Sequence, residues 1–248
     1  MAGRGPIRAA TLGGVARPAS PPTRGWFITI EGPEGGGKTT QAARLEAWLR
    51  GAGVAVIRTR EPGGTKLGEQ LRDVLLNATT GAAQIDPLAD ALIFNAARRQ
   101  LVAEIVRPAL DSGTTVICAR FADSTLAYQG YGSGLGLDIL RSLERVATDG
   151  LRPDLTILLD VPIEVGLARK TETADQTRFE TDFDVAFHRR VRDGFLSLAA
   201  ADADRFAVVD AAASEEVVWS AVRLAVGRLL GPSDAPNEPD RPAVRIPG

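Results

Sequence analysis

The segment Gly32–Thr39, GPEGGGKT, constrains this chain more than any other part of its sequence, because it matches the pattern G-x-x-x-x-G-K-[ST] in full. Trp26–Glu31 before it is a short apolar run typical of a β-strand, and Lys38–Arg50 after it has helical spacing. Main-chain amides of a glycine-rich loop can converge on one anion, and the N-terminus of the following helix adds positive potential. The motif and its context together predict a P-loop, which holds the phosphates of a nucleotide.

Each residue of this loop is a candidate nucleotide ligand: Gly32, Pro33, Glu34, Gly35, Gly36, Gly37, Lys38 and Thr39. Lys38 is expected to reach the β- and γ-phosphates as a catalytic residue, and the hydroxyl of Thr39 is expected to ligate Mg²⁺. The loop by itself leaves GTPases, ATPase motors and small-molecule kinases open.

Short apolar segments alternate with helical ones along the rest of the chain. Further strands are expected at Val54–Thr59, Thr115–Cys118, Leu155–Asp160 and Phe206–Val209. Further helices are expected at Lys66–Asn77, Asp86–Leu110, Leu137–Ala147, Pro162–Lys170, Phe179–Ala201 and Ser214–Leu230. This order predicts an α/β fold with a five-stranded, mainly parallel sheet and helices on both faces. Ligands of such folds sit at the carboxyl ends of the strands.

The composition favours a cytoplasmic globular protein. Of the 248 residues, 44% are apolar and 24% are charged, which is an ordinary balance for a soluble domain. The formal charge of −2 gives no reason to expect nucleic acid or a membrane surface as a partner. With Cys118 alone, an internal disulfide is excluded. The longest apolar runs are far shorter than the ~20 residues that cross a bilayer.

The two ends differ from the middle. Residues 1–25 contain four arginines and no acidic residue, and residues 231–248 contain five prolines. We expect a disordered basic extension, or an over-early start, before the domain and a disordered tail after it. The single domain is expected to span residues 26–230.

Seven further pieces of sequence, in one colinear order, resemble bacterial thymidylate kinase, a P-loop nucleoside monophosphate kinase. They are Glu34, REPGGT at 60–65, FNAAR at 94–98, Arg120 with Ser124, YQG at 128–130, RPDL at 152–155 and LDV at 159–161. The resemblance covers roughly residues 26–230. It implies the P-loop kinase fold, ATP and dTMP as substrates, Mg²⁺ as cofactor, and a homodimer.

The resemblance implies a pyrimidine pocket built around Phe94, Arg98 and Tyr128. Phe94 and Arg98 are four residues apart in a predicted helix and therefore share one face. Phe94 is expected to stack on the thymine ring, and Arg98 to donate to its O4. Tyr128 is expected to crowd the 2′ position of the sugar and so to favour a deoxynucleotide.

The resemblance also implies which residues bind the sugar and phosphate of dTMP. Arg120 follows a predicted strand, where its guanidinium fork suits an acceptor phosphate, and it is a candidate catalytic residue. Arg60, after another strand, is a second phosphate ligand. Glu34 is expected to accept a hydrogen bond from the 3′-hydroxyl.

Residues 169–180, RKTETADQTRFE, fall where the family has a mobile lid over ATP. Arg178 is the candidate catalytic residue there, as a stabiliser of transition-state charge, with Arg169 or Lys170 as substitutes. The lid carries fewer arginines than related lids, and the aspartate expected before Arg178 is Thr177.

The match breaks at Ala119, because the family normally has Asp-Arg where this chain has Ala119-Arg120. Loss of a carboxylate that acts through water beside the metal is expected to slow the reaction about 10–100-fold. Asp123 is near enough in sequence to be considered as a substitute. Three hypotheses follow: phosphorylation of dTMP to dTDP, phosphorylation of a modified pyrimidine deoxynucleotide, or a catalytically weak nucleotide-binding protein.

Overall fold

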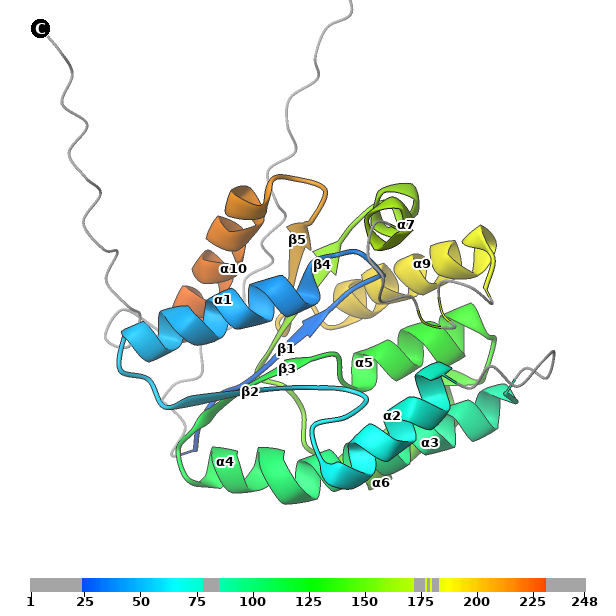
Figure 1. Cartoon of the computed structure of the whole chain (residues 1–248), viewed down its shortest axis with the longest axis horizontal. Helices are drawn as coiled ribbons and strands as arrows, with labels where there is room; N and C mark the ends of the chain where they lie inside the picture. Colours follow the sequence, from blue (N-terminus) through cyan, green and yellow to red (C-terminus); the bar gives the residue numbers. More distant parts are fainter. Residues whose placement is uncertain (1–23, 78–84, 172–176, 178, 180–182, 231–248) are drawn as a thin grey trace, which may run out of the picture.

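The computed structural model describes residues 24–77, 85–171, 177, 179 and 183–230. Its centre is a sheet of five parallel strands in the order β2-β3-β1-β4-β5 (Figure 1). The strands are β1 Phe27–Glu31, β2 Val56–Arg60, β3 Thr115–Ala119, β4 Leu155–Asp160 and β5 Phe206–Asp210. The prediction of a five-stranded α/β fold is confirmed, and the sheet is parallel throughout rather than mainly so.

One face of the sheet is covered by α1, Lys38–Gly51, and α10, Glu215–Leu230 (Figure 1). The apolar side chains of this face come from alternate strand positions, such as Ile28 and Ile30, and pack against Leu45 and Leu49 of α1. This alternation is what a pleated strand produces when helices cover it. No Asp, Glu, Lys or Arg from the described parts of α1 or α10 is buried.

The other face is covered by a larger group of helices. They are α3 Pro87–Leu101, the π-helical η1 Val102–Val106, α4 Arg107–Asp111, α6 Leu137–Thr148 and α9 Val185–Ala201. α2, Lys66–Asn77, packs outside α3, and α7, Ile163–Thr171, follows β4. The short α5, Ala122–Thr125, and the π-helical η2, Leu126–Gly132, lie between β3 and α6.

The structure corrects the predicted helices in three places. The helix predicted over residues 86–110 changes hydrogen-bond register at η1, ahead of Pro108, whose nitrogen has no hydrogen to donate. The glycine-bearing segment after β3, for which no helix was predicted, forms α5 and η2. The helix predicted over 179–201 is not continuous: Phe179 is helical, but the helix is interrupted at Phe183 and Asp184, and α9 begins at Val185, where the Asp184 side chain accepts the Phe187 N–H at 2.7 Å and caps it.

The described part of the domain begins at Arg24. Its guanidinium binds the Asp154 carboxylate at 2.8 and 3.1 Å, which joins the segment before β1 to the segment before β4. Residues 1–23 of the extension predicted over 1–25, the predicted tail at 231–248 and Arg178 lie outside the described residues. None of the helices described is both long and apolar enough to span a bilayer.

Candidate active site

The P-loop lies between β1 and α1, where the motif predicted it. Gly32 and Gly35 have φ angles of 137° and 69°, which suit glycine and strain other residues. A Cβ on Gly32 would lie 2.3 Å from the Leu159 carbonyl oxygen, and one on Gly35 would lie 2.0 Å from that of Gly166. The loop therefore needs glycine for close packing on β4 and α7 as well as for its own curvature.

Lys38 reaches back across this loop. Its ammonium donates to the carbonyl oxygens of Gly32 at 2.9 Å and Pro33 at 2.6 Å. Burial and the nearby charge of Arg120 lower the pKa of Lys38 to about 7, against the opposing effect of Glu34. A bound phosphate would favour the charged ammonium, so the group is poised to bind an anion.

One pocket joins the P-loop to the carboxyl ends of the strands. Eight of the predicted site residues line it: Glu34, Lys38, Thr39, Arg60, Phe94, Arg98, Arg120 and Tyr128. They come from β2, α1, α3, η2 and the turns that follow β1 and β3. The pocket is therefore assembled from segments that are far apart in the sequence, as the parallel sheet predicts.

Arg120, Glu34 and Tyr128 form a closed triangle at the centre of this pocket. Arg120 Nη2 donates to Glu34 Oε1 at 2.6 Å and to the Tyr128 hydroxyl oxygen at 3.1 Å. The Tyr128 hydroxyl in turn donates to Glu34 Oε1 at 2.8 Å. Burial alone would raise the pKa of Glu34, but Arg120, Lys38 and Tyr128 lower it to about 2. Glu34 is therefore ionised at neutral pH and pairs with the charged guanidinium of Arg120.

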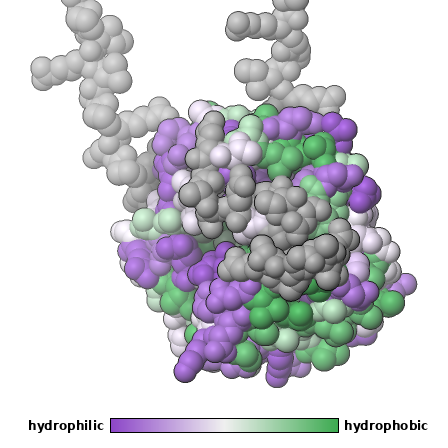
Figure 2. All heavy atoms as spheres, turned by 45° about the vertical axis from the view of Figure 1, so that its right-hand side comes forward, coloured by the Kyte–Doolittle hydropathy of each residue, from purple (hydrophilic) through white to green (hydrophobic). Residues whose placement is uncertain are grey.

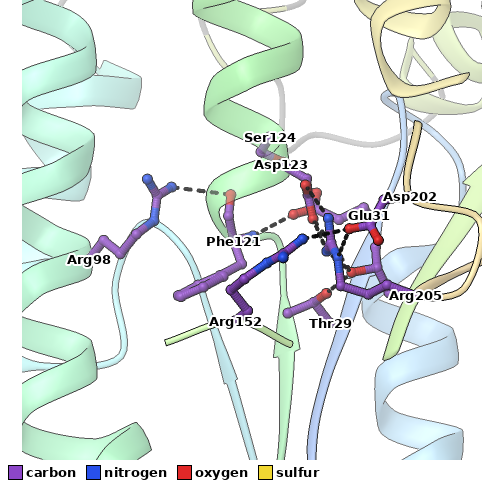
Figure 3. A network of polar contacts seen from close by, with 10 residues as sticks. Thr29, Glu31, Arg98, Phe121, Asp123, Ser124, Arg152, Asp202 and Arg205 are labelled. Carbon is purple, nitrogen blue, oxygen red and sulfur yellow. Dashed lines mark hydrogen bonds and ion pairs between the residues drawn. The ribbon is translucent and has the colours of Figure 1, made fainter. Parts of the chain in front are cut away.

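Arg98 forms the floor of the pocket and is only 1% exposed. Its guanidinium binds Glu61 at 2.8 Å, Asn95 Oδ1 at 3.1 Å and the Phe121 carbonyl oxygen at 3.1 Å, the last contact being visible in Figure 3. Glu61 Oε1 is buried and has no hydrogen-bond partner among the described residues. The pKa of the Glu61 carboxyl is raised by its burial, although Arg98 opposes this. These groups hold Arg98 in one orientation.

Aromatic rings line the pocket on another side. The ring of Phe94 lies 6.3 Å from that of Phe179, and Phe179 meets Tyr128 edge to face at 5.3 Å. Phe179 is only 6% exposed. A planar base entering here has flat apolar surface beside it and the polar groups of Arg98 beneath it.

Thr39 is exposed at the start of α1 and lines the same pocket. Mg²⁺ commonly takes one or two protein oxygens and completes its shell with substrate phosphate and water. No cluster of three or more His, Cys, Asp or Glu side chains suited to a metal occurs in the part of the chain that the structure describes. A single hydroxyl beside a phosphate-binding loop suits Mg²⁺, because the phosphate oxygens of the nucleotide and water would supply most of its other ligands.

Comparison with known proteins identifies the family. The sequence profile of thymidylate kinase matches residues 30–222. The thymidylate kinase of Deinococcus radiodurans is 52% identical over 204 residues, which make up 81% of this chain and 97% of that protein. The chain belongs to the thymidylate kinase family.

Other members of the thymidylate kinase family agree with this assignment. The thymidylate kinase of Thermomicrobium roseum is 53% identical over 206 residues, 83% of this chain and 96% of that protein. The crystal structure of thymidylate kinase from Ehrlichia chaffeensis has a TM-score of 0.64 at 35% identity and covers 81% of this chain and 98% of its own. The resemblance drawn from the seven sequence segments is therefore confirmed, and so is the fold.

Ala119, where the thymidylate kinase resemblance predicted aspartate, lines the pocket with Lys38 and Thr39. Asp123 does not replace the absent carboxylate, contrary to the suggestion from its sequence position. The Asp123 carboxylate is 4% exposed and is bound by Arg205 Nη1 at 2.7 Å and Nη2 at 3.0 Å. It lies in α5, where it also accepts from the Thr156 hydroxyl of β4 at 3.4 Å, and it is not among the residues that line the pocket with Lys38 and Thr39.

Of the three lid candidates for stabilising transition-state charge, Arg169, Lys170 and Arg178, the first two have described positions. Arg169 donates to the carbonyl oxygens of Gly35 at 3.4 Å and Ala211 at 2.8 Å, so it braces the P-loop from outside. Lys170 lines the pocket. Arg178 stays a prediction.

Several lining residues were not singled out from the sequence: Glu61, Pro62, Arg72, Leu76, Phe121, Thr125, Gln129 and Phe179. Glu61 and Pro62 belong to the REPGGT segment, and Gln129 belongs to YQG, so the segments carried them without assigning them a role. Phe179 had a different signal, because an apolar ring within a polar stretch needs somewhere to be buried.

Proposed function

We propose that this protein is an enzyme that transfers the γ-phosphoryl group of ATP to dTMP, giving ADP and dTDP. One observation carries this proposal. A single pocket is lined both by Lys38 and Thr39 of the phosphate-loop motif and by Phe94 and Arg98, which suit a planar base. Membership of the thymidylate kinase family supports the same substrates.

In the proposed reaction, the P-loop amides and Lys38 hold the triphosphate, while Phe94 and Arg98 hold the thymine ring. Arg120 binds the acceptor phosphate and directs its oxygen in line with the γ-phosphorus, and Arg60 closes the site from β2. The attacking phosphate oxygen is already ionised, so no general base is required. Catalysis then consists of alignment and neutralisation of charge.

Mg²⁺ belongs to this proposal as well, with Thr39 as its protein ligand. When bound, the ion neutralises negative charge on the phosphate oxygens of ATP. Glu34 is proposed to accept a hydrogen bond from the 3′-hydroxyl of dTMP, and Tyr128 to stand against the 2′ carbon. A 2′-hydroxyl would meet the Tyr128 ring, which is packed against Phe179 and Phe187.

The proposal is tested by a coupled ADP-release assay with dTMP, dUMP, dCMP and AMP as acceptors. A clear preference for dTMP is expected. Equal rates with all four would reject the substrate assignment. Binding of ATP and dTMP without any turnover would instead support the alternative of a catalytically weak nucleotide-binding protein.

We also propose a homodimer, supported by apolar side chains that α2, α3 and α6 leave exposed. They are Leu67, Val74, Leu88, Leu92, Ile139 and Val146, with exposures from 40% to 77%. Figure 2 shows hydrophobic surface in the lower half of the displayed face, the height at which Figure 1 draws these helices. Sedimentation equilibrium of the wild type and of Leu92→Glu tests this, since the charged variant is expected to be monomeric.

A further inference from the structure

Arg120 has a backbone conformation that its residue type disfavours. Its φ angle is 69°, in the left-handed region, where a side chain with a Cβ is strained by roughly 1–2 kcal/mol. Such strain persists only where the surroundings determine the backbone more strongly than the residue itself does. The contacts that hold this peptide unit therefore also hold the guanidinium that faces Glu34 and Tyr128.

Three groups hold the backbone on either side of Arg120. Its own N–H donates to the Ile30 carbonyl oxygen at 2.9 Å, and its carbonyl oxygen accepts from the Cys118 thiol at 3.0 Å. The next N–H, that of the fully buried Phe121, donates to Glu31 Oε1 at 2.6 Å. Ile30 and Glu31 belong to β1, the strand before the P-loop, and Cys118 belongs to β3. Of the two groups from β1, Ile30 contributes a main-chain carbonyl and Glu31 contributes an ionisable side chain.

Glu31 has a second contact that reaches the Arg120 side chain. Its Oε2 accepts the Ser124 hydroxyl at 2.6 Å, and the Ser124 oxygen lies 3.2 Å from Arg120 Nη1 as its acceptor. One carboxylate thus supports both the main chain after Arg120 and the hydroxyl against which its guanidinium rests. Figure 3 draws Glu31 with Phe121 and Ser124 in this network.

The surroundings of Glu31 are closed to solvent and balanced in charge. Glu31 is 0% exposed at the end of β1. The nearest second carboxylate, Asp123, is paired with Arg205, which is itself fixed by Asp202 at 2.6 Å. These pairs are drawn around Glu31 in Figure 3. A buried, hydrogen-bonded carboxylate that touches no part of the predicted substrate positions has a structural task toward its neighbours.

We propose that Glu31 is a positioning residue, which acts through Phe121 and Ser124 to hold Arg120 toward the acceptor phosphate. This inference rests on the proposed function, because it assigns Arg120 to that phosphate. Without Glu31, the buried Phe121 N–H loses its acceptor, the backbone at Arg120 relaxes to negative φ, and the guanidinium withdraws from the pocket. The P-loop itself, held by Lys38 and its glycines, stays competent for ATP.

The kinetic test compares four variants at pH 8 with saturating ATP and magnesium: Glu31→Ala, Glu31→Gln, Ser124→Ala and the control Glu144→Gln. Glu144 is a half-buried carboxylate on α6 outside the pocket. Glu31→Ala is expected to lower kcat/KM for dTMP about 100-fold, the scale of a misplaced catalytic group. Its Kd for ATP, measured by calorimetry without dTMP, is expected to stay near the wild-type value.

The remaining variants distinguish positioning from general damage. Glu31→Gln keeps an acceptor for the Phe121 N–H and is expected to recover most of the lost activity. Ser124→Ala removes only the side-chain contact and is expected to fall between the two. Equal weakening of ATP and dTMP, no rescue by Gln, or an effect no larger than that of Glu144→Gln would each overturn the proposal.

A crystal structure of Glu31→Ala separates this inference from the substrate assignment. It is expected to show Arg120 at negative φ with its guanidinium away from Glu34. Arg120 unmoved would overturn the positioning role even in an active dTMP kinase. Arg120 displaced, in a protein whose wild type does not use dTMP, would uphold the role and reject the substrate. If Glu31→Ala does not fold, the structure of Ser124→Ala tests the side-chain half of the proposal: the guanidinium is expected to move away from Glu34 while the φ of Arg120 stays positive, and an unmoved guanidinium would overturn this half.

Discussion

The two faces of the sheet are built from the same five strands but have opposite interiors. The face under α1 and α10 is filled by aliphatic side chains such as Leu45, Leu49 and Val222. Among the described residues, the buried Asp, Glu and Arg side chains lie on the other side or in the turns that border it: Glu31, Glu61, Asp90, Arg98 and Asp123. The pocket residues Phe94, Arg98 and Tyr128 come from α3 and η2, on that second side.

This difference separates the source of stability from the source of specificity. Burial of aliphatic carbon stabilises the fold without any need for a defined partner. Burial of charge costs desolvation and is offset only where each group finds its counterpart. The charged face is therefore the less efficient way to stabilise a sheet, and its retention points to ligand binding.

The largest effect is expected from Arg98→Met, which leaves the Glu61 carboxylate buried without its partner. Removal of one member of a buried ion pair typically costs about 3–5 kcal/mol of unfolding free energy. Chemical denaturation measures this loss, and the ADP-release assay is expected to show that little activity with dTMP remains. The double variant Arg98→Met, Glu61→Leu is expected to recover much of the stability but none of the activity. Recovery of both would contradict the separation of the two faces.

On the aliphatic face, Leu49→Ala is expected to lower stability and to leave activity unchanged. Leu49 is 0% exposed, and its truncation should cost about 2–5 kcal/mol of unfolding free energy through lost burial and a cavity. The KM for dTMP and the kcat of the folded protein should not change. Leu49 lies near the C-terminal end of α1, whereas the pocket residues Lys38 and Thr39 lie at its N-terminal end. Leu224→Ala on exposed α10 surface serves as control, with an expected change within about 0.5 kcal/mol. A large change in KM with Leu49→Ala would show that the aliphatic face also shapes the site.

Ala119→Asp tests the boundary between the faces, at the carboxyl end of β3. Restoring a carboxylate beside Lys38 and Thr39 is expected to raise kcat about 10–100-fold, the reverse of a lost outer-shell partner of a metal. Ala119→Asn, which matches the shape without the charge, is expected to give little increase. An unchanged or lower rate with Asp, at unchanged stability, would mean that the site works without this carboxylate.

The stability of the protein is also expected to depend on pH through Glu31. Burial and the nearby Asp123 raise the pKa of Glu31 from 4.5 to about 7. Between these values the unfolded chain releases the proton while the folded protein keeps it, so wild-type stability falls as pH rises through that window. Glu31→Gln cannot titrate, and its stability relative to the wild type should therefore rise from pH 4.5 to 7 and then level off. Urea unfolding at pH 5, 6, 7 and 8 measures this, and a difference that shrinks with pH would contradict the pKa shift.

The two faces also differ in how far the sequence predicts them. The P-loop is contiguous, so Gly32–Thr39 carries its own geometry, and the alternating apolar strands predict the covered sheet. The contacts of Arg98 with Glu61 and of Glu31 with Ser124 join residues 37 and 93 positions apart. No local spacing encodes such pairs, because they depend on strand order and on the turn at Arg120. The same reason explains why Asp123, close to Ala119 in sequence, faces a different neighbour.

The pairing of Arg120 with Glu34 gives the pocket an internal counterion. An incoming anion must displace this carboxylate from the guanidinium, and a monophosphate can do so because it brings two negative charges of its own. A neutral nucleoside brings none and leaves the internal pair intact. On the proposed assignment of Arg120 to the acceptor phosphate, we therefore expect the protein to discriminate between thymidine and its phosphate before any contact with ATP, through the cost of exchanging one anion for another.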